Sequence, residues 1–225
     1  PPTPAPIARS RYGIADDAFV VLFVFDAHSF YERKNPQAVI EAFKHAFTTH
    51  ERQHQARLMM KVNNISASPA HEQALRSAMR DVNGILIDDY LHYSDVSGLF
   101  VLCDAYISLH RAEGFGLTLA EAMYFETPVI TTGYSGNMDF TSHDNSFIVP
   151  YSLIELEETY GPYTAGNVWA EPDVRVAADY LRQIYENQDG AREVAERAGQ
   201  VIQRKHSPVV VGEYLQTLLR NRELL

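Results

Sequence analysis

The sequence predicts an α/β protein built on a doubly wound parallel sheet of about six strands, Rossmann-like, with a helical C-terminus. Short apolar runs recur along the chain, and segments with helical spacing of apolar residues separate them. Strands buried on both faces are continuously apolar, and strands that alternate with helices favour parallel pairing through right-handed crossovers. At 225 residues and 46% hydrophobic content, the chain can bury a full core.

The expected strands are the apolar runs between turn signals. The first, 19–25, is apolar, β-branched and aromatic throughout, as a strand with both faces covered requires. Strands are also expected over 57–62, 85–87, 105–109, 129–132 and 147–149. The stretch from Tyr151 to Pro172 is expected to be irregular, because it is rich in Tyr and contains Gly.

Capping residues mark where the expected helices begin. Asn35-Pro36 and Ser68-Pro69 each offer an N-cap followed by a proline that fits the first helical position. Ser94 is expected to cap a helix over 95–103. Further helices are expected over 117–125, 173–187, 191–205 and 210–225.

The first residues, PPTPAPIARSRYGI, predict a Pro-rich interdomain linker over 1–14. Proline-rich segments are extended, and this one lacks an initiating Met, a basic start and an apolar signal core. We therefore expect the chain to be the C-terminal part of a longer protein, with 15–225 forming one Rossmann-like domain.

Charge and cysteine content exclude several classes of function. A formal net charge of −10 argues against nucleic-acid binding and gives no indication of membrane contact. The lone Cys103 lies in the apolar run LFVLC, which is typical of a small buried hydrophobe, so a cytoplasmic location is expected. No apolar run reaches the ~18 residues that a membrane-spanning helix needs.

The stretch HRAEGFGLTLAEAM joins the fourth expected strand to the helix over 117–125. Gly114 and Gly116 can adopt φ > 0 and let a ligand approach the backbone. The helix start offers free N–H groups and the positive end of the helix dipole, which suit an anion. A tight turn with packing glycines would give the same pattern.

Two glutamates in this stretch favour a site. Glu121 lies one turn into an otherwise apolar helix, where its carboxylate can accept two hydrogen bonds from a vicinal diol such as ribose. Glu113, in the turn, could accept from sugar hydroxyls. The alternative for Glu121 is a glutamate favoured by the helix dipole, worth ~0.3–1 kcal/mol, and the alternative for Glu113 is a solvated loop acid. Together the features describe a nucleotide-sugar pocket.

The motif EGFGLTLAE resembles the signature of retaining family-4 glycosyltransferases. The segment AMYFETPVITTGYSGN is similar to its continuation, and FDAHSFYERKNPQAVIEAF, DNSFIVP and AEPDVRVAADYLRQI extend the resemblance along most of the chain. The resemblance implies one half of a GT-B fold, in which two Rossmann-like domains face each other across a cleft. This chain would be the donor-binding half, and the missing N-terminal domain would bind the acceptor, in a pathway of polysaccharide biosynthesis.

The resemblance assigns roles residue by residue. It implies that Glu121 holds the nucleotide ribose and Glu113 the donor sugar, while Arg33 and Lys34 face the diphosphate. Cations there would stabilise charge on the leaving diphosphate, so Glu113, Lys34 and Arg33 are the expected catalytic residues. The backbone expected to line the sugar and diphosphate is that of Gly114, Phe115, Gly116, Leu117 and Thr118.

The implied reaction moves a sugar from a nucleotide diphosphate sugar to a hydroxyl acceptor with retention of configuration. The sequence contains no Asp-x-Asp pair that would hold a metal, and no metal or cofactor is expected beyond the donor substrate.

Three positions depart from the family pattern or are less specific. His28 stands where the family has a second basic residue, and histidine is only partly charged at neutral pH. Gly136 lies in Tyr-Ser-Gly-Asn where the family has a glycine pair. Tyr90 could stack on the nucleotide base or be an ordinary surface tyrosine.

A rival motif and two other features keep alternatives open. His50-Glu-Arg-Gln-His54 matches the zinc motif H-E-x-x-H, but it lies at the polar end of the first expected helix, so a zinc hydrolase is only a remote alternative. A second alternative is a non-catalytic nucleotide-sugar-binding or assembly module. Some aromatic residues could line an interface with the missing domain or cover the sheet edge, namely Tyr151, Tyr160, Tyr163 and Trp169.

Overall fold

A computed structural model describes residues 1–222 and contains a six-stranded sheet with the strand order β3-β2-β1-β4-β5-β6. Every neighbouring pair in this sheet is parallel. The strands are β1 (Phe19–Asp26), β2 (Ala56–Asn63), β3 (Ile85–Ile87), β4 (Ala105–Ser108), β5 (Val129–Thr132) and β6 (Phe147–Val149). The predicted α/β fold with a doubly wound sheet is confirmed, and the direction of winding reverses between β1 and β4.

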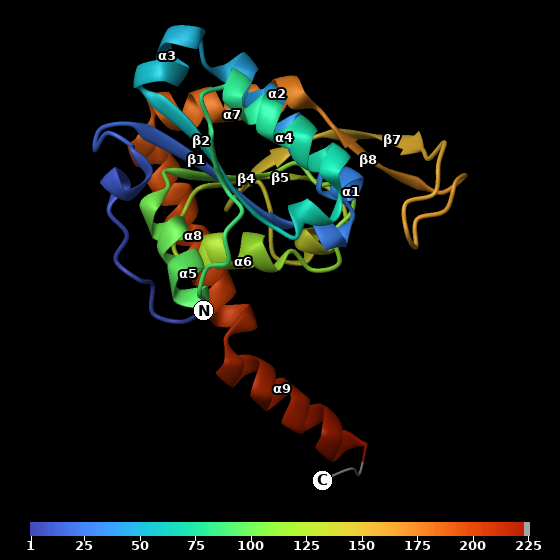
Figure 1. Cartoon of the computed structure of the whole chain (residues 1–225). Helices are drawn as coiled ribbons and strands as arrows, with labels where there is room; N and C mark the ends of the chain where they lie inside the picture. The colour runs from blue at the N-terminus through green and yellow to red at the C-terminus, as the bar shows by residue number, and fades with distance from the viewer. Residues whose placement is uncertain (223–225) are drawn as a thin grey trace.

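Helices cover both faces of the sheet (Figure 1). On one face α2 packs against α4 and α7, and on the other α6 packs against α5 and α8. The helices are α1 (Tyr31–Lys34), α2 (Pro36–Ala46), α3 (Thr49–His54), α4 (Pro69–Asp81), α5 (Tyr93–Leu102), α6 (Leu117–Tyr124), α7 (Val174–Glu186), α8 (Gln188–His206) and α9 (Pro208–Asn221). Short 3-10 helices are η1 (Arg9–Tyr12), η2 (Ala27–Ser29), η3 (Ile65–Ala67) and η4 (Gly136–Asp139).

The first residues lie against α5 rather than apart from the body. Ala5 donates its backbone N–H to the carbonyl of Ser94 at 2.9 Å, and Arg9 pairs with Asp104 at 3.0 Å. Their role as an interdomain linker stays a prediction. Within the described residues, no helix is both long and apolar enough to cross a membrane.

The last helix, α9, extends away from the body of the domain (Figure 1). None of its residues is buried, and Val209, Tyr214 and Leu215 are more than half exposed. The last residues of the expected helix, 223–225, lie outside the described residues.

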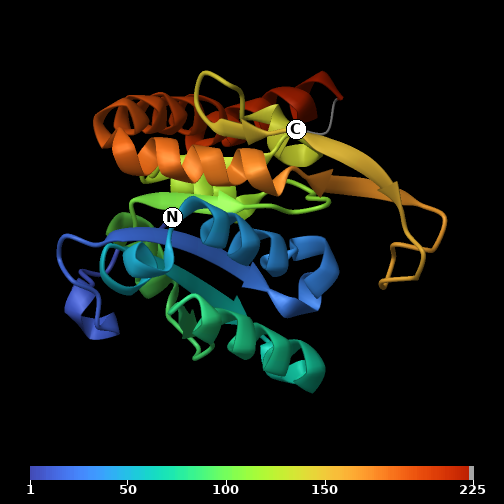
Figure 2. The same ribbon diagram turned by 90° about the horizontal axis from the view of Figure 1, so that it is seen from above.

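The expectation that 151–172 is irregular is wrong. These residues form an antiparallel hairpin of β7 (Tyr151–Glu155) and β8 (Val168–Pro172), paired from Tyr151 with Pro172 to Glu155 with Val168. Figure 2 shows the hairpin projecting sideways from the sheet. All five residues of β7 are exposed, so this strand lacks the alternation of buried and exposed positions by which a strand is recognised in sequence.

Pro36 and Pro69 begin their helices as predicted, but the residues expected to cap these helices make no capping hydrogen bond. Asn35 adopts the left-handed conformation at φ 53°, where its side chain makes no capping hydrogen bond. Asparagine tolerates this conformation, and here it turns the chain directly from α1 into α2. Ser68 makes no side-chain cap either, and α5 begins at Tyr93 with His92 as its N-cap, so Ser94 lies inside the helix.

The H-E-x-x-H segment from His50 to His54 lies in the separate short helix α3 and not at the end of a longer helix. Thr48 and Glu51 form a capping box, and both oxygens of Glu51 accept hydrogen bonds from Arg182 on α7. The carboxylate that a zinc hydrolase would use as a base is therefore engaged in holding α3 to α7. Among the described residues, no three or more His, Cys, Asp or Glu side chains cluster as a metal site would require.

Glu51 gives a pH-dependent contribution to stability. Hydrogen bonding from Arg182 lowers its pKa from 4.5 to about 2. A depressed pKa means that the stabilisation is complete above pH 4.5 and is lost as the pH falls toward 2. We expect Glu51→Gln to lower the free energy of unfolding by about 1 kcal/mol at pH 7, because the pair is only partly screened by solvent. In denaturant titrations the difference from wild type should vanish near pH 2.

Glu186→Gln is the matched control for this prediction. Glu186 also faces Arg182, at 3.8 Å, but its side chain is 66% exposed, so the substitution should change stability little at any pH. Equal effects of the two substitutions at pH 7 would contradict the assignment.

Candidate functional site

The candidate site lies where β1 and β4 end, at the point where the winding of the sheet reverses. The chain leaving β1 forms η2 and α1, and the chain leaving β4 forms the turn before α6. In open parallel sheets ligands bind beyond the carboxyl ends of the strands at such a point. The structure brings both segments together there, although they are far apart in the sequence.

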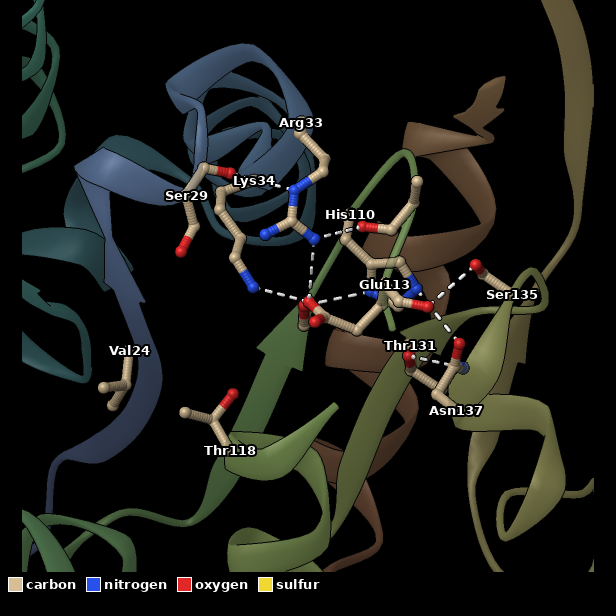
Figure 3. A network of polar contacts seen from close by, with 12 residues as sticks. Val24, Ser29, Arg33, Lys34, His110, Glu113, Thr118, Thr131, Ser135 and Asn137 are labelled. Carbon is tan, nitrogen blue, oxygen red and sulfur yellow. Dashed lines mark hydrogen bonds and ion pairs between the residues drawn. The ribbon is translucent and has the colours of Figure 1, made fainter. Parts of the chain in front are cut away.

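Arg33, Lys34 and Glu113 meet at this edge of the sheet (Figure 3). The amine of Lys34 lies 2.5 Å from Oε2 of Glu113, and NH1 of Arg33 lies 3.5 Å from the same oxygen. The three side chains are between 10% and 14% exposed. The predicted catalytic residues thus form one charged cluster, although their chemical role stays a prediction.

Arg33 is held by backbone carbonyls on both sides of the cluster. Its Nε donates to the carbonyl of Ser29 at 2.9 Å, and its NH1 donates to the carbonyl of Ala112 at 2.7 Å. The backbone N–H of Arg111 in turn donates to the carbonyl of Arg33 at 2.8 Å. The guanidinium therefore fixes the loop after β1 to the loop after β4.

The cluster carries more positive than negative charge. Burial lowers the pKa of the Lys34 amine, and the neighbouring Glu113 carboxylate opposes this shift. Burial also disfavours ionisation of Glu113, but Lys34 and Arg33 outweigh it and lower the pKa of Glu113. Two cations facing one carboxylate favour the binding of an additional anion at this place.

The start of α6 adds to the attraction for an anion. Gly116 precedes the helix at φ 92°, as the sequence predicted for this glycine, and no side chain caps the first turn. The N–H groups of Leu117 and Thr118 therefore have no side-chain acceptor, and they carry the positive end of the helix dipole. Thr118 is fixed from below by a 2.8 Å hydrogen bond from the Tyr106 hydroxyl.

Gly114, the other glycine of the turn, has a different backbone conformation from Gly116. Gly114 does not use the positive φ that a glycine permits. Its carbonyl is instead covered by Gly136, where an added Cβ would lie 1.9 Å from the Gly114 oxygen. Gly136 and Ser135 also donate to the carbonyl of Glu113, at 3.0 Å and 2.8 Å. Gly136 is required for this close approach of two backbones.

Beneath the cluster lies a buried polar network that sequence reasoning missed. His110 is completely buried, and its Nε2 lies 3.1 Å from both the carbonyl of Tyr134 and Oδ1 of Asn137. Since both partners are acceptors, Nε2 carries the proton and Nδ1 accepts from Ser108. Burial lowers the pKa of His110, which keeps the ring neutral. A histidine directly after a buried strand was the only signal in the sequence.

Glu121 is also buried, at 6% exposure, and accepts a hydrogen bond from the hydroxyl of Tyr93 at the start of α5. Burial raises the pKa of Glu121, and burial together with Glu121 raises the pKa of Tyr93 to about 12. Both side chains border a cavity of about 610 Å³, along with Phe115, Leu117 and Tyr124. The sequence indicated Glu121 but not its tyrosine partner.

Two predicted donor contacts lie outside the charged cluster. His28 is exposed in η2, and Tyr90 is 86% exposed in the loop after β3, where its ring contacts His92 edge-on at 6.1 Å. Neither makes a hydrogen bond to Arg33, Lys34 or Glu113 in the described structure. Their roles in donor binding stay predictions.

Comparison with known proteins identifies the family. Residues 5–201 match the family described as glycosyl transferases, group 1, which is most of the chain. The chain belongs to this family. Among curated protein sequences, none matches it at a significant level.

Solved structures share the fold of this glycosyltransferase domain. Anabaena Alr3699/HepE, determined in complex with UDP and glucose, has a TM-score of 0.71 at 17% identity, covering 95% of this chain and 51% of that one. Sucrose-phosphate synthase (tll1590) from Thermosynechococcus elongatus has a TM-score of 0.72 at 16% identity, covering 97% and 49%. The C-terminal domain of LpcC from Francisella tularensis has a TM-score of 0.62 at 17% identity, covering 92% and 96%.

These comparisons confirm the predicted fold as one half of a GT-B glycosyltransferase. The chain spans about half the length of the first two proteins and nearly all of an isolated C-terminal domain. At these identities the similarity shows the fold alone, and the roles of the individual site residues rest on the geometry described above.

Asn137 should be essential for the shape of the site. Its amide donates to the carbonyl of Thr132 at 2.9 Å, and its carbonyl oxygen faces His110. We expect Asn137→Ala to lower the free energy of unfolding by about 1–3 kcal/mol, because buried polar partners lose their hydrogen bonds. Asn167→Ala, which removes only an exposed bond to Thr164, should cost less than about 0.5 kcal/mol in the same denaturant titration. Equal losses would show that the buried network does not support the loop.

Proposed function

We propose that this chain is the donor-binding half of a retaining, family-4 glycosyltransferase. The enzyme transfers a sugar from a nucleotide diphosphate sugar to a hydroxyl acceptor without a metal ion. The observation that carries the proposal is the cluster of Arg33, Lys34 and Glu113 opposite the uncapped start of α6. HepE, which shares the fold, has been solved with UDP-glucose, which supports a nucleotide sugar as the donor here.

The diphosphate is the part of the donor that the cluster suits best. Breaking the sugar–phosphate bond leaves extra negative charge on the diphosphate, and preorganised cations and N–H groups stabilise that charge. Lys34 and Arg33 would contact it from one side, and the N–H groups of Leu117 and Thr118 from the other. This arrangement supplies the positive charge that a metal ion would otherwise provide, and it is our reason for proposing a metal-independent reaction.

Glu113 would change partners when the donor binds. In the free protein it accepts from Lys34, and its lowered pKa keeps it ionised. A diphosphate would compete for the Lys34 amine and leave the Glu113 carboxylate to accept hydrogen bonds from the sugar hydroxyls. In the absence of the donor, Lys34 and Glu113 thus bind each other through the atoms that would otherwise bind the diphosphate and the sugar.

Glu121 would bind the ribose through its 2′ and 3′ hydroxyls. Its carboxylate lines the cavity beside α6 and is oriented by Tyr93. The backbone from Gly114 to Thr118 would line the sugar and diphosphate. Further donor contacts are proposed for Phe115, Gly136, His28 and Tyr90.

The acceptor would be bound by a further domain, since related enzymes are about twice as long as this chain. Retention of configuration is proposed from the family-4 resemblance of the Glu113 to Glu121 segment. The same resemblance, with the lone buried Cys103, supports a cytoplasmic enzyme of polysaccharide biosynthesis.

Thermal unfolding with nucleotides tests the donor site. We expect one of uridine, guanosine, adenosine or thymidine diphosphate to raise the midpoint of unfolding, also with a chelator present. Ligand at ~100 times its dissociation constant adds ~2.7 kcal/mol, and each kcal/mol shifts the midpoint by ~2–4 °C in a domain of this size. Glu121→Gln should reduce the shift, whereas Glu193→Gln, on the exposed side of α8, should not.

The absence of any shift would contradict a donor site carried by this chain. A shift that requires a divalent cation would contradict metal independence. To distinguish an enzyme from a non-catalytic binding module, Glu113→Gln should be tested in the full-length protein. Loss of sugar transfer with retained nucleotide binding supports the enzyme, and the lack of any transfer by the wild type with every acceptor supports the binding module.

A further inference from the structure

The β7–β8 hairpin supports α1, the helix that carries Arg33 and Lys34, and the residue leading into it, at two separate points. At one point the contact runs through Arg111, which lies two residues before Glu113 and between the hairpin and α1, and at the other the tip of the hairpin touches Phe30. Neither the hairpin nor Arg111 belongs to the donor contacts described above. One point of contact lies on Glu32, next to Arg33, and the other lies on Phe30, three residues before Arg33.

Arg111 connects the base of the hairpin to α1. Its Nε donates to Glu171 on β8 at 2.7 Å, and its guanidinium lies over the Trp169 ring, 5.1 Å from the centroid. NH1 of the same guanidinium donates a hydrogen bond to the carbonyl of Glu32 at 3.0 Å. The backbone of Arg111 also joins α1 to β8: its N–H donates to the carbonyl of Arg33 at 2.8 Å, and its carbonyl accepts from the N–H of Ala170 at 3.0 Å.

The tip of the hairpin rests on Phe30, the residue that leads into α1. Gly161 lies so close that an added Cβ would be 2.0 Å from the Phe30 ring, and Tyr163 packs edge-on against the same ring at 5.9 Å. Phe30 has φ 66°, an unfavourable conformation for an aromatic residue. The hairpin tip therefore helps to hold the chain in the conformation from which α1 starts.

The hairpin is stiff enough to transmit these contacts. Trp169 is only 4% exposed, and its ring stacks on Tyr160 at 5.4 Å. The backbone pairing continues beyond the strands through a 2.8 Å hydrogen bond from Leu156 to Asn167. Aromatic packing of this kind fixes the tip relative to the base of the hairpin.

We propose that the β7–β8 hairpin, acting through Gly161 on Phe30 and through Arg111 on α1, is the positioning element that sets Arg33 and Lys34 for the outer phosphate of the donor. The proposal rests on the proposed function, because it concerns how the same two cations are held in position for the donor. Arg111 and the hairpin act on α1 and on Phe30 and make no proposed contact with the donor, so they are positioning groups and not catalytic ones. A cation displaced by a fraction of an ångström stabilises a phosphate less well, since such contacts depend strongly on geometry.

The test uses two glycines of the hairpin that share a backbone conformation. Gly161 and Gly166 both have positive φ, at 57° and 87°, so alanine strains the backbone at either position. Only at Gly161 does the new Cβ collide with Phe30, whereas at Gly166 the nearest atom is 4.0 Å away. Gly166→Ala is therefore the matched control for Gly161→Ala.

Dissociation constants are measured by calorimetry for uridine diphosphate and uridine monophosphate, or for the matching pair of the base selected by the thermal screen. We expect Gly161→Ala to weaken binding of the diphosphate about tenfold relative to Gly166→Ala, with the monophosphate bound equally by both, because only the outer phosphate depends on the cations. Arg111→Lys should show the same selective loss, since lysine cannot make the contacts to Glu171, Trp169 and Glu32 together.

Equal diphosphate affinity in the two glycine variants would overturn the role of the hairpin, and so would an equal loss of mono- and diphosphate binding. If wild type binds no nucleoside diphosphate at all, the donor site itself is wrong. If wild type binds and the variants do not differ, only the positioning role fails.

Discussion

The electrostatic pairing of two cations with one carboxylate, at a place largely closed to water, is the interaction on which the rest of this structure depends. Charges that are taken out of water require compensation. Glu113 compensates Lys34 directly, and the carbonyls of Ser29 and Ala112 accept from Arg33. Because two positive charges face one negative charge, the compensation is incomplete, and an anionic ligand completes it.

Several parts of the fold that lie outside this cluster hold it in place. The neutral His110 and Asn137 fix the loop whose Ser135 and Gly136 bind the carbonyl of Glu113. The strand order places α1 and the start of α6 side by side at the reversal between β1 and β4. A parallel sheet with this order thus supplies the frame, and buried polar contacts set the positions of the charged atoms within it.

Sequence patterns predicted the fold well because burial dictates them. The strands 85–87, 129–132 and 147–149 were predicted at their observed bounds, since continuous apolar runs identify strands covered on both faces. The glutamates and cations followed from a motif. The β7–β8 hairpin escaped prediction because β7 is exposed along its whole length and so lacks an apolar pattern, and Tyr93, His110 and Asn137 escaped because their partners lie far away in the sequence. Left-handed Asn35 shows that a good capping residue also suits a tight turn.

Calorimetric titration of a nucleoside diphosphate into Lys34→Gln tests the central claim most directly. The account predicts affinity at least about tenfold lower than in wild type, since a charge-assisted phosphate contact is lost. It also predicts a weaker dependence of affinity on salt. Lys44→Gln, which removes a cation paired with Glu41 on α2, should bind like wild type. If Lys34→Gln binds the diphosphate as tightly as wild type, the buried cations do not form the donor site.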